Sequence, residues 1–315
     1  MAVHPVTYVK ATYVMGQVLS FLTLFRQTFA NFRKNDPVRM AGATAFFAFF
    51  GLPPMVIILS QVFSTLLQDR QQTISVRLFG RLAEIFGPQS ARQLKDISQH
   101  LQQDRTDPLL TTLSILILLI SATSMFAIMK RSLNQLWNVK PKEDRSSLYI
   151  LRDRLVFLAL VLGSGLLFMG AIGIHQALNL LSAPPSGSDK IFLDTAHYVL
   201  SVVLLMIWFV MLFKVLPDSR IRWPAVWIGS LVTAVLFTFG ELILNQLLTY
   251  SQLRSLYGTA GRITLVLLFV YYCSLIFYFG ASFTRQYAKW IDMEIEPKTT
   301  AVGYSITEDD EQPKE

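Results

Sequence analysis

Glu241 is the one acidic residue well inside a long apolar stretch of this sequence. A carboxylate is costly to place in lipid, so we expect it to face the interior of a helix bundle and find a donor there. Asn245 lies four residues later, on the same helical face. Arg262 and Tyr257, near the start of the next apolar stretch, are the nearest candidate partners. This set predicts an outer gate or a headgroup site, or else a structural tie between two helices.

Pro53 and Pro54 form a second candidate position, in the middle of the first apolar stretch. Consecutive prolines remove two backbone donors and clash with the preceding turn, so a bend or a break is expected over residues 48–54. Transporters use broken helices to line a site at the middle of the membrane. The alternative is a kink that only shapes helix packing.

Other polar residues stand near the ends of apolar stretches. Lys130, Arg131 and Lys214 close two of these stretches, and we interpret them as anchors whose charged ends reach the membrane surface. His175 and Asn179 share a helical face near the outer end of another stretch, where contact with headgroups or water would explain them.

A catalytic or metal site is not indicated. The four histidines are scattered, and none has zinc-ligand spacing to another or to Cys273. Metal-assisted phosphodiester cleavage needs clustered carboxylates or histidines, and the basic loops offer only dispersed acids, such as Asp153 and Asp218. Walker, nucleophile-elbow and zinc-protease motifs are absent from the sequence. We therefore predict a protein that is not an enzyme and takes no cofactor.

The elements that must position these residues are membrane helices. Of the 315 residues, 52% are apolar and 16% are charged, against roughly 25% charge in a soluble domain. Spanning helices need about 20 mostly apolar residues, and six stretches qualify. They are Met40–Leu67, Leu109–Met129, Leu155–Leu181, Thr195–Leu216, Pro224–Thr249 and Ile263–Tyr287. The predicted fold class is all-α, a polytopic membrane protein with six transmembrane helices.

The charge distribution predicts the orientation. Lys and Arg are concentrated in the short segments on the side of the two termini, so the positive-inside rule places both termini in the cytoplasm. The same distribution accounts for the net charge of +7 without nucleic acid as a partner. Membrane lipids are the expected partners, while a homo-oligomer or an envelope-protein partner stays open.

Three segments lie outside the six predicted spans: the N-terminal segment, the first outer loop and the C-terminal tail. Residues 1–35 form a cytoplasmic N-terminal segment in which Val14–Phe32 is interpreted as an amphipathic helix, either in the membrane interface or packed on the bundle. The membrane domain covers residues 36–291 and includes a predicted outer helical hairpin over residues 68–107. Residues 292–315 are predicted to be a disordered cytoplasmic tail.

The sequence resembles the YihY/BrkB family of bacterial inner-membrane proteins. The resemblance rests on five parts of the chain: Asp36-Pro37 with Ala41–Pro54, Asn134-Gln-Leu-Trp137, Lys214-Val-Leu-Pro217-Asp with Arg222-Trp223 and Trp227-Ile-Gly229, Tyr257–Gly261, and Tyr271 with Gly280-Ala281. Where the family pattern has an acidic residue after Gly-Ala, this chain has Ser282.

The resemblance implies a multi-pass protein of the bacterial inner membrane. Some members carry a ribonuclease BN label, which the residues of this chain do not support. The favoured hypothesis is transport or sensing of a lipid-like or amphipathic envelope component. The alternatives are a structural or assembly partner of envelope proteins and, less favoured, a membrane-tethered hydrolase or ribonuclease. The candidate substrate or gating residues are Pro53, Pro54, Asn134, Trp137, Glu241, Asn245, Tyr257, Gly258, Arg262 and Tyr271.

Overall fold

The computed structural model describes residues 23–66, 108–144, 147–181, 188–250, 258–293 and 295–305. Six long helices carry most of this part of the chain, and each coincides with one of the predicted apolar stretches to within several residues. They are α2 (Pro37–Leu66), α5 (Pro108–Leu136), α6 (Ser147–Leu181), α7 (Ser188–Val215), α8 (Trp223–Tyr250) and α10 (Gly258–Trp290). Pro37 and Pro108 occupy the first helical position, where the missing N–H costs nothing.

Four of these helices contain segments long and apolar enough to cross a membrane. The segments are Leu148–Ala171, Tyr198–Val215, Trp223–Leu242 and Leu267–Trp290. In α2 the apolar part is shorter, Pro37–Leu52. The described part of the chain is therefore mostly helical, with four candidate spans, whereas spans formed by α2 and α5 stay a prediction. The predicted outer hairpin of residues 68–107 lies outside the described residues.

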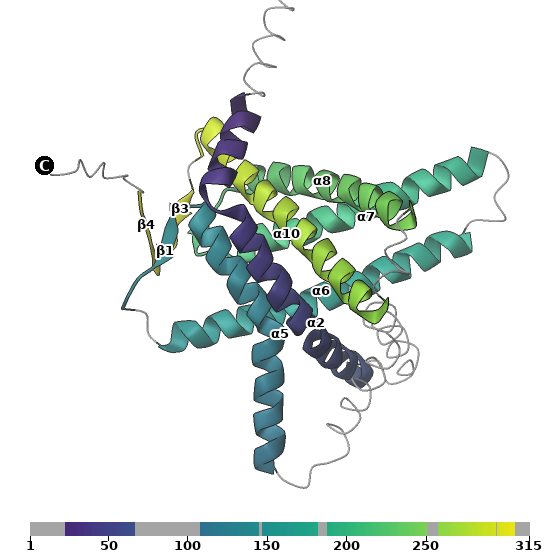
Figure 1. The fold of residues 1–315 in the computed structure, drawn as a ribbon, viewed down its shortest axis with the longest axis horizontal. Helices are drawn as coiled ribbons and strands as arrows, with labels where there is room; N and C mark the ends of the chain where they lie inside the picture. Colours follow the sequence, from purple (N-terminus) through teal and green to yellow (C-terminus); the bar gives the residue numbers. More distant parts are fainter. Residues whose placement is uncertain are drawn as a thin grey trace, which may run out of the picture.

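The helices pack as a bundle around α10 and α5 (Figure 1). Helix α2 lies against both α5 and α10, α8 packs between α10 and α7, and α6 contacts α5 and α7. Aromatic side chains of α7 and α10 fill the interior, where the Phe213 and Phe277 rings stack with centroids 5.3 Å apart. Tyr278, which is fully buried, shares a hydrogen bond with Thr44 of α2.

Helices α8 and α10 approach closely at two matched glycine–threonine contacts. A Cβ atom on Gly229 would meet Thr284 Oγ1 at 1.9 Å, and one on Gly280 would meet Thr233 Oγ1 at the same distance. Each threonine hydroxyl also donates to the carbonyl of the glycine in its own helix. Small residues thus permit close packing of the two helices at Gly229 and Gly280. In α6, by contrast, nothing lies within 4 Å of a Cβ on Gly170.

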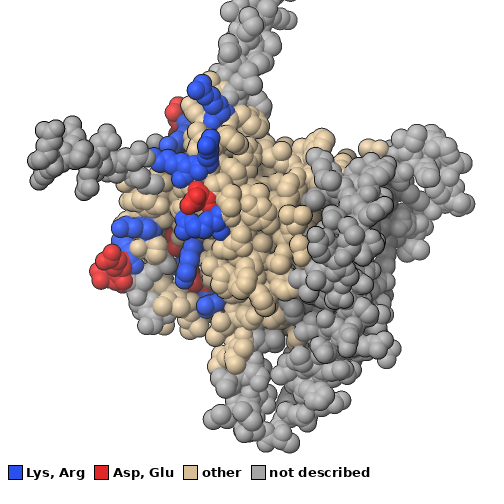
Figure 2. Space-filling model, in the orientation of Figure 1, with Lys and Arg blue, Asp and Glu red and all other residues tan. Residues whose placement is uncertain are grey.

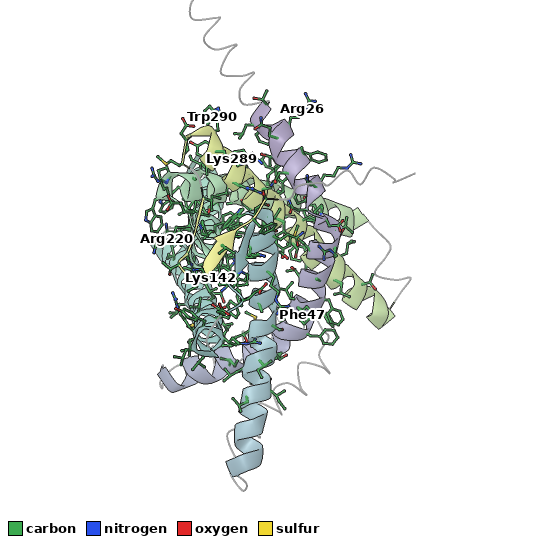
Figure 3. All side chains as sticks on the ribbon, turned by 90° about the vertical axis from the view of Figure 1, so that its left-hand side faces the viewer. Arg26, Phe47, Lys142, Arg220, Lys289 and Trp290 are labelled. Carbon is green, nitrogen blue, oxygen red and sulfur yellow. The ribbon has the colours of Figure 1, made fainter. Side chains whose placement is uncertain are left out.

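Helix α2 changes direction in its second half, beyond Phe47 (Figures 1 and 3). The helical assignment nevertheless runs unbroken from Pro37 to Leu66 and includes Pro53 and Pro54. The two prolines therefore go with a bend rather than with a break of the helix, because a helix can lose single donors and still continue when it is packed. Gly51 sits against the Ser121 carbonyl oxygen of α5, 3.3 Å from an added Cβ, so the two backbones are close there.

The segment after α10 is folded, which corrects the prediction of a disordered tail from Asp292. Strand β4 (Ala301–Gly303) pairs with β1 (Val139–Pro141), the strand that follows α5. Strand β3 (Glu296–Pro297) pairs with β2 (Ser219–Arg220), the strand that follows α7. The polar composition of this segment suggested disorder, but backbone pairing with two distant loops holds it in place. Residues 306–315 lie outside the described residues.

The described part of the N-terminal helix, residues 23–34, packs on α10. Asn31 Nδ2 donates to Ser282 Oγ over 2.9 Å, and Ser282 Oγ donates to the Thr28 carbonyl oxygen over 3.0 Å. The Phe25 and Phe283 rings lie 5.5 Å apart. The sequence left two interpretations of this segment, a helix in the membrane interface or a helix packed on the bundle. Residues 23–34 are packed on the bundle. Ser282 thus serves in helix docking, at the place where the family pattern has an acid.

One end of the molecule collects the charged side chains. We call it the charged end: it holds the four strands, the starts of α2, α6 and α8, and the ends of α5, α7 and α10 (Figure 1). Figure 2 shows Lys and Arg gathered there, whereas the described surface beside it is largely free of charge. Viewed from this end, Lys142, Arg220 and Lys289 surround the strands (Figure 3).

Candidate functional site: a basic cleft at the charged end

A cleft of about 960 Å³ opens at the charged end. Its walls come from the start of α2, the end of α5, strand β1, the start of α6, the α7–α8 connection and the end of the described C-terminal segment. Six basic side chains line it: Lys34, Arg39, Lys130, Arg131, Lys140 and Arg154. Two acidic residues, Asp153 and Asp218, also line it, so its charge is strongly positive.

Lys130 stands at the base of the cleft between two carboxylates. Its Nζ atom lies 2.7 Å from Asp153 Oδ1 on α6 and 2.9 Å from Asp218 Oδ1 after α7. The Lys130 and Asp218 side chains are buried, at 10% and 8% exposure, while Asp153 is 30% exposed. A buried ammonium is tolerated only when it is paired and hydrogen-bonded, and these two carboxylates provide the pairing.

Asn134 and Asp218 hold each other in a fixed orientation. Asn134 Nδ2 donates to Asp218 Oδ2 over 2.9 Å, and the Asp218 backbone N–H donates to Asn134 Oδ1 over 2.9 Å. Asn134 lies one helical turn after Lys130 on α5, so both side chains reach the same carboxylate. The end of α5 is thereby fixed to the loop after α7.

Lys298 approaches the same group from the C-terminal segment. Its Nζ atom donates to the Pro217 carbonyl oxygen over 2.6 Å, and its backbone N–H donates to the Asp218 carbonyl oxygen over 2.9 Å. Burial lowers the pKa of Lys298, and the nearby Asp218 carboxylate offsets only part of this effect. A small polar pocket of about 30 Å³ lies behind the ion pair and is lined by Lys130, Asp153 and Lys298 among others. The Lys130–Asp153 pair therefore borders both this pocket and the cleft.

The turn between α5 and β1 is held from α10. Arg285 Nη1 donates to the Leu136 carbonyl oxygen over 2.6 Å and to Asn138 Oδ1 over 3.1 Å. Asn138 has a φ of 53°, a left-handed conformation that asparagine tolerates well. Trp137 is buried, and its Nε1–H donates to the Ala281 carbonyl oxygen over 2.9 Å. The wall that carries Lys140 is thus anchored to the bundle.

The cations at the rim of the cleft differ from Lys130 in their surroundings. Arg131 and Lys140 are exposed. Arg39 is also exposed and contacts Asp36 at 3.6 Å, while Arg154 donates to Thr123 Oγ1 over 3.0 Å. Exposed ion pairs and neutral acceptors hold cations weakly, so these side chains can turn toward an incoming anion.

The structure brings together two of the predicted site residues. Asn134 lines the cleft and Trp137 braces its wall. Tyr271 packs against the bundle core, and Pro53 and Pro54 lie in α2, so neither position joins the cleft. Gly258 is the first residue of α10. Tyr257 and the side chains of Asn245 and Arg262 lie outside what the structure describes.

Glu241 does not face the interior of the bundle as predicted. Its side chain is exposed on α8. Because Glu241 comes at the end of the apolar segment Trp223–Leu242, it can reach a polar layer without entering the bundle. The predicted burial was therefore wrong.

Sequence reasoning missed the residues that carry the charge of the site. Lys130 was interpreted as an anchor reaching the membrane surface, yet it is buried between two carboxylates. Asp153 and Asp218 were considered only as dispersed acids in separate loops. The available signal was the spacing of Lys130 and Asn134, one turn apart at the end of an apolar helix, together with the Pro217-Asp218 step.

The chemistry that the described side chains of this site supply is ionic binding. Both of its carboxylates contact Lys130, and Asp218 also binds Asn134. Within the described residues, no group of three His, Cys, Asp or Glu side chains could hold a metal ion. What the site presents to solvent is a set of basic side chains, with Arg39, Arg131 and Lys140 exposed, around a buried group of paired polar residues.

Comparison with known proteins identifies the family. The family described as virulence factor BrkB matches residues 28–302. A "UPF0761 membrane protein" of Chromohalobacter salexigens is 23% identical over 282 residues, which are 85% of this chain and 65% of the relative. A protein of the same name from Teredinibacter turnerae is 22% identical over 277 residues, 88% of this chain and 62% of the relative.

A third relative, the "UPF0761 membrane protein" of Coxiella burnetii, is 25% identical over 256 residues, 80% of this chain and 88% of its own length. This chain thus spans less than two thirds of the length of the first two relatives. The relatives' names describe membrane proteins and no enzymatic activity. No solved structure matches the chain. Because the family match covers most of its residues, the chain is a membrane protein that belongs to the BrkB virulence-factor family.

Proposed function

We propose that this protein binds an anionic, lipid-like component of the bacterial envelope in the basic cleft, as a step in moving or sensing that component. The observation that carries the proposal is the composition of the cleft, with six basic and two acidic side chains around one cavity. A cavity of about 960 Å³ is large enough for a lipid headgroup with part of its chains.

The walls of the cleft also suit an amphipathic ligand. Apolar side chains, among them Ala127, Ile150 and Phe157, alternate with the cations. Phosphate and carboxylate groups would bind Arg and Lys through charge-assisted hydrogen bonds, while the acyl part would contact the apolar side chains. Ile150 is exposed at the start of α6, so the apolar wall continues toward the segment Leu148–Ala171, a candidate span.

Exposed tryptophans support a membrane surface at this level. Trp223 and Trp227 begin α8, Trp290 ends α10, and all three are exposed at the charged end. The Lys214 ammonium lies 4.7 Å from the centre of the Trp223 ring. Tryptophan and lysine are enriched where hydrocarbon meets water. The cleft would therefore open beside the headgroup layer.

We infer a six-span arrangement in the membrane. Helices α2 and α5, of 30 and 29 residues, add two spans to the four candidates and give six. The charged end faces the cytoplasm of a bacterial inner membrane, because Lys and Arg are retained on that side. Both termini then lie in the cytoplasm. A non-enzymatic role follows from the two carboxylates of the cleft, which neutralise Lys130 rather than standing ready to transfer protons.

Lipid binding to the purified, detergent-solubilised protein tests the proposal. Native mass spectrometry would compare phosphatidic acid, phosphatidylglycerol and phosphatidylcholine at equal concentration. The cleft variant is Arg131→Gln with Lys140→Gln, and the matched control is Arg220→Gln with Lys289→Gln. Both pairs remove two exposed cations at the charged end, but only the first pair lines the cleft.

We expect the wild type and the control variant to bind the two anionic lipids in preference to phosphatidylcholine, and the cleft variant to bind them about tenfold more weakly. That factor corresponds to losing two partly exposed charge contacts of about 0.7 kcal/mol each. Equal loss in both variants would show that only overall charge matters and would contradict a site in the cleft. An absence of anionic preference would leave the assembly-partner role as the better account.

A further inference from the structure

The described chain ends at the wall of the basic cleft. Tyr304 and Ser305 both line the cleft, directly after strand β4. The position is fixed by backbone pairing, since Val302 is opposite Lys140 and the Tyr304 N–H donates to the Asn138 carbonyl oxygen over 3.0 Å. The residues after Ser305 must therefore start at the mouth of this cleft.

The sequence after Ser305 is strongly acidic. Glu308, Asp309, Asp310 and Glu311 stand in a row, beginning three residues after Ser305. Because an extended chain covers at most about 3.6 Å per residue, Glu308 lies within roughly 11 Å of Ser305. The electrostatic screening length at physiological ionic strength is about 8 Å, which is comparable with this reach, so the start of the acidic run can come within range of the cations of the cleft.

We propose that the acidic segment Glu308–Glu311 docks in the basic cleft and competes there with anionic ligands. The charges match, because the six basic and two acidic residues of the cleft leave an excess of four positive charges for four carboxylates. The regulatory meaning of this contact rests on the proposed function, whereas the contact itself can be tested without lipid.

The short connection favours this occupant over an acidic segment of another protein. A tethered segment experiences a local concentration in the millimolar range, so even weak ion pairs keep it bound for much of the time. The exposed cations Arg131 and Lys140 are available to the segment, while Lys130 stays engaged by its two carboxylates. An anionic lipid would have to displace the segment before it could bind.

Disulfide trapping in the full chain tests the contact. Cys273 is the one cysteine of the sequence, so Cys273→Ser gives a background without thiols. Gln135→Cys places a thiol in the cleft wall on α5, and Gln312→Cys places one directly after the acidic segment. Both are substitutions of uncharged residues, and the charges under test therefore remain. The matched control carries the same cysteines with Glu308→Gln, Asp309→Asn, Asp310→Asn and Glu311→Gln.

At low salt we expect the chain with the acidic segment to form the disulfide at least about fourfold faster than its neutral control. Four weak, exposed ion pairs would give a rate ratio of about this size. At 1 M salt, where screening extends over only about 3 Å, the two rates should converge. Equal rates at low salt would overturn the proposed contact, because chance collision of a tethered thiol would then explain all trapping.

Binding of phosphatidic acid to the neutral-segment chain, with its native residues at 135 and 312, separates the two proposals. Charge-dependent trapping together with stronger lipid binding to the neutral-segment chain would support docking and competition. Charge-dependent trapping with unchanged lipid binding would keep the contact, overturn the competition, and place lipid binding outside the cleft. Loss of the contact with lipid binding intact would leave the proposed function standing alone.

Discussion

The acidic residues near the two ends of α8 have opposite surroundings. Asp218, just before the helix, is buried with Lys130 and Asn134 as partners drawn from α5. Glu241, near the other end of the apolar segment, is exposed. The comparison shows that a carboxylate becomes part of a site when distant segments bring it partners. The position of a single acidic residue within an apolar stretch does not predict that the residue belongs to a site.

Removing the central cation should have the largest effect. Lys130→Met leaves Asp153 and Asp218 close together without their shared ammonium, and breaking a buried ion pair in this way costs about 3–5 kcal/mol. Thermal unfolding in detergent should report a large fall in melting temperature. Lys289→Met, which removes an exposed lysine at the same end, serves as the control and should change stability by less than about 0.5 kcal/mol.

Adding Asp218→Asn to Lys130→Met sharpens the test. The second substitution removes one of the uncompensated charges and should recover part of the lost stability. Additive losses from the two substitutions would mean that Lys130 and Asp218 are not coupled, contrary to the 2.9 Å contact.

Lys298 gives a smaller effect that depends on pH. Burial lowers the pKa of its ammonium below the ordinary 10.5, so the unfolded chain holds this proton at pH values where the folded chain has released it. Stability contributed by this group therefore rises with pH between the lowered pKa and 10.5. The melting temperature of the wild type, relative to Lys298→Met, should increase as the pH rises toward 10.5.

The direction of that difference is the test. A wild-type advantage that shrinks over the same range would indicate a raised pKa, with the Asp218 charge outweighing burial. Because the variant differs only at Lys298, the titration of groups that do not interact with Lys298 cancels in the comparison.

Glu241 should give the smallest effect of the set. As an exposed side chain it contributes little packing, so Glu241→Gln and Glu241→Leu should each change stability by less than about 0.5 kcal/mol. Anionic lipid binding should stay unchanged in both. A loss of several kcal/mol in Glu241→Leu, with Glu241→Gln normal, would restore the interpretation of Glu241 as a tie between α8 and α10.

Local patterns sufficed for the helices but not for the site. The apolar stretches located six long helices, because this signal acts within about twenty residues of chain. The ion pairs of Lys130 join residues 23 and 88 positions apart, a separation that hydrophobic periodicity does not encode. The strands after α10 were missed because each is two or three residues long and is stabilised by pairing with distant loops.

The resemblance to a family came nearer to the site than residue chemistry did. Its Asn134…Trp137 element supplies one cleft residue and one brace, and its Pro217-Asp218 step contains the central carboxylate. Residue chemistry alone favoured Glu241 as a site residue, because a charged side chain inside an apolar stretch is costlier in lipid than one at the end of a helix.

Photo-crosslinking tests the central claim most directly. The full chain in nanodiscs would be irradiated with phosphatidic acid carrying a diazirine near its headgroup, and labelled peptides would be mapped by mass spectrometry. We predict that labelling concentrates on peptides containing residues 127–141 and 150–157, which line the cleft, and that Arg131→Gln with Lys140→Gln reduces it severalfold. A phosphatidylcholine analogue should not label these peptides preferentially. The same labelling pattern for both lipids, unchanged by the substitutions, would contradict an anionic lipid site in the cleft.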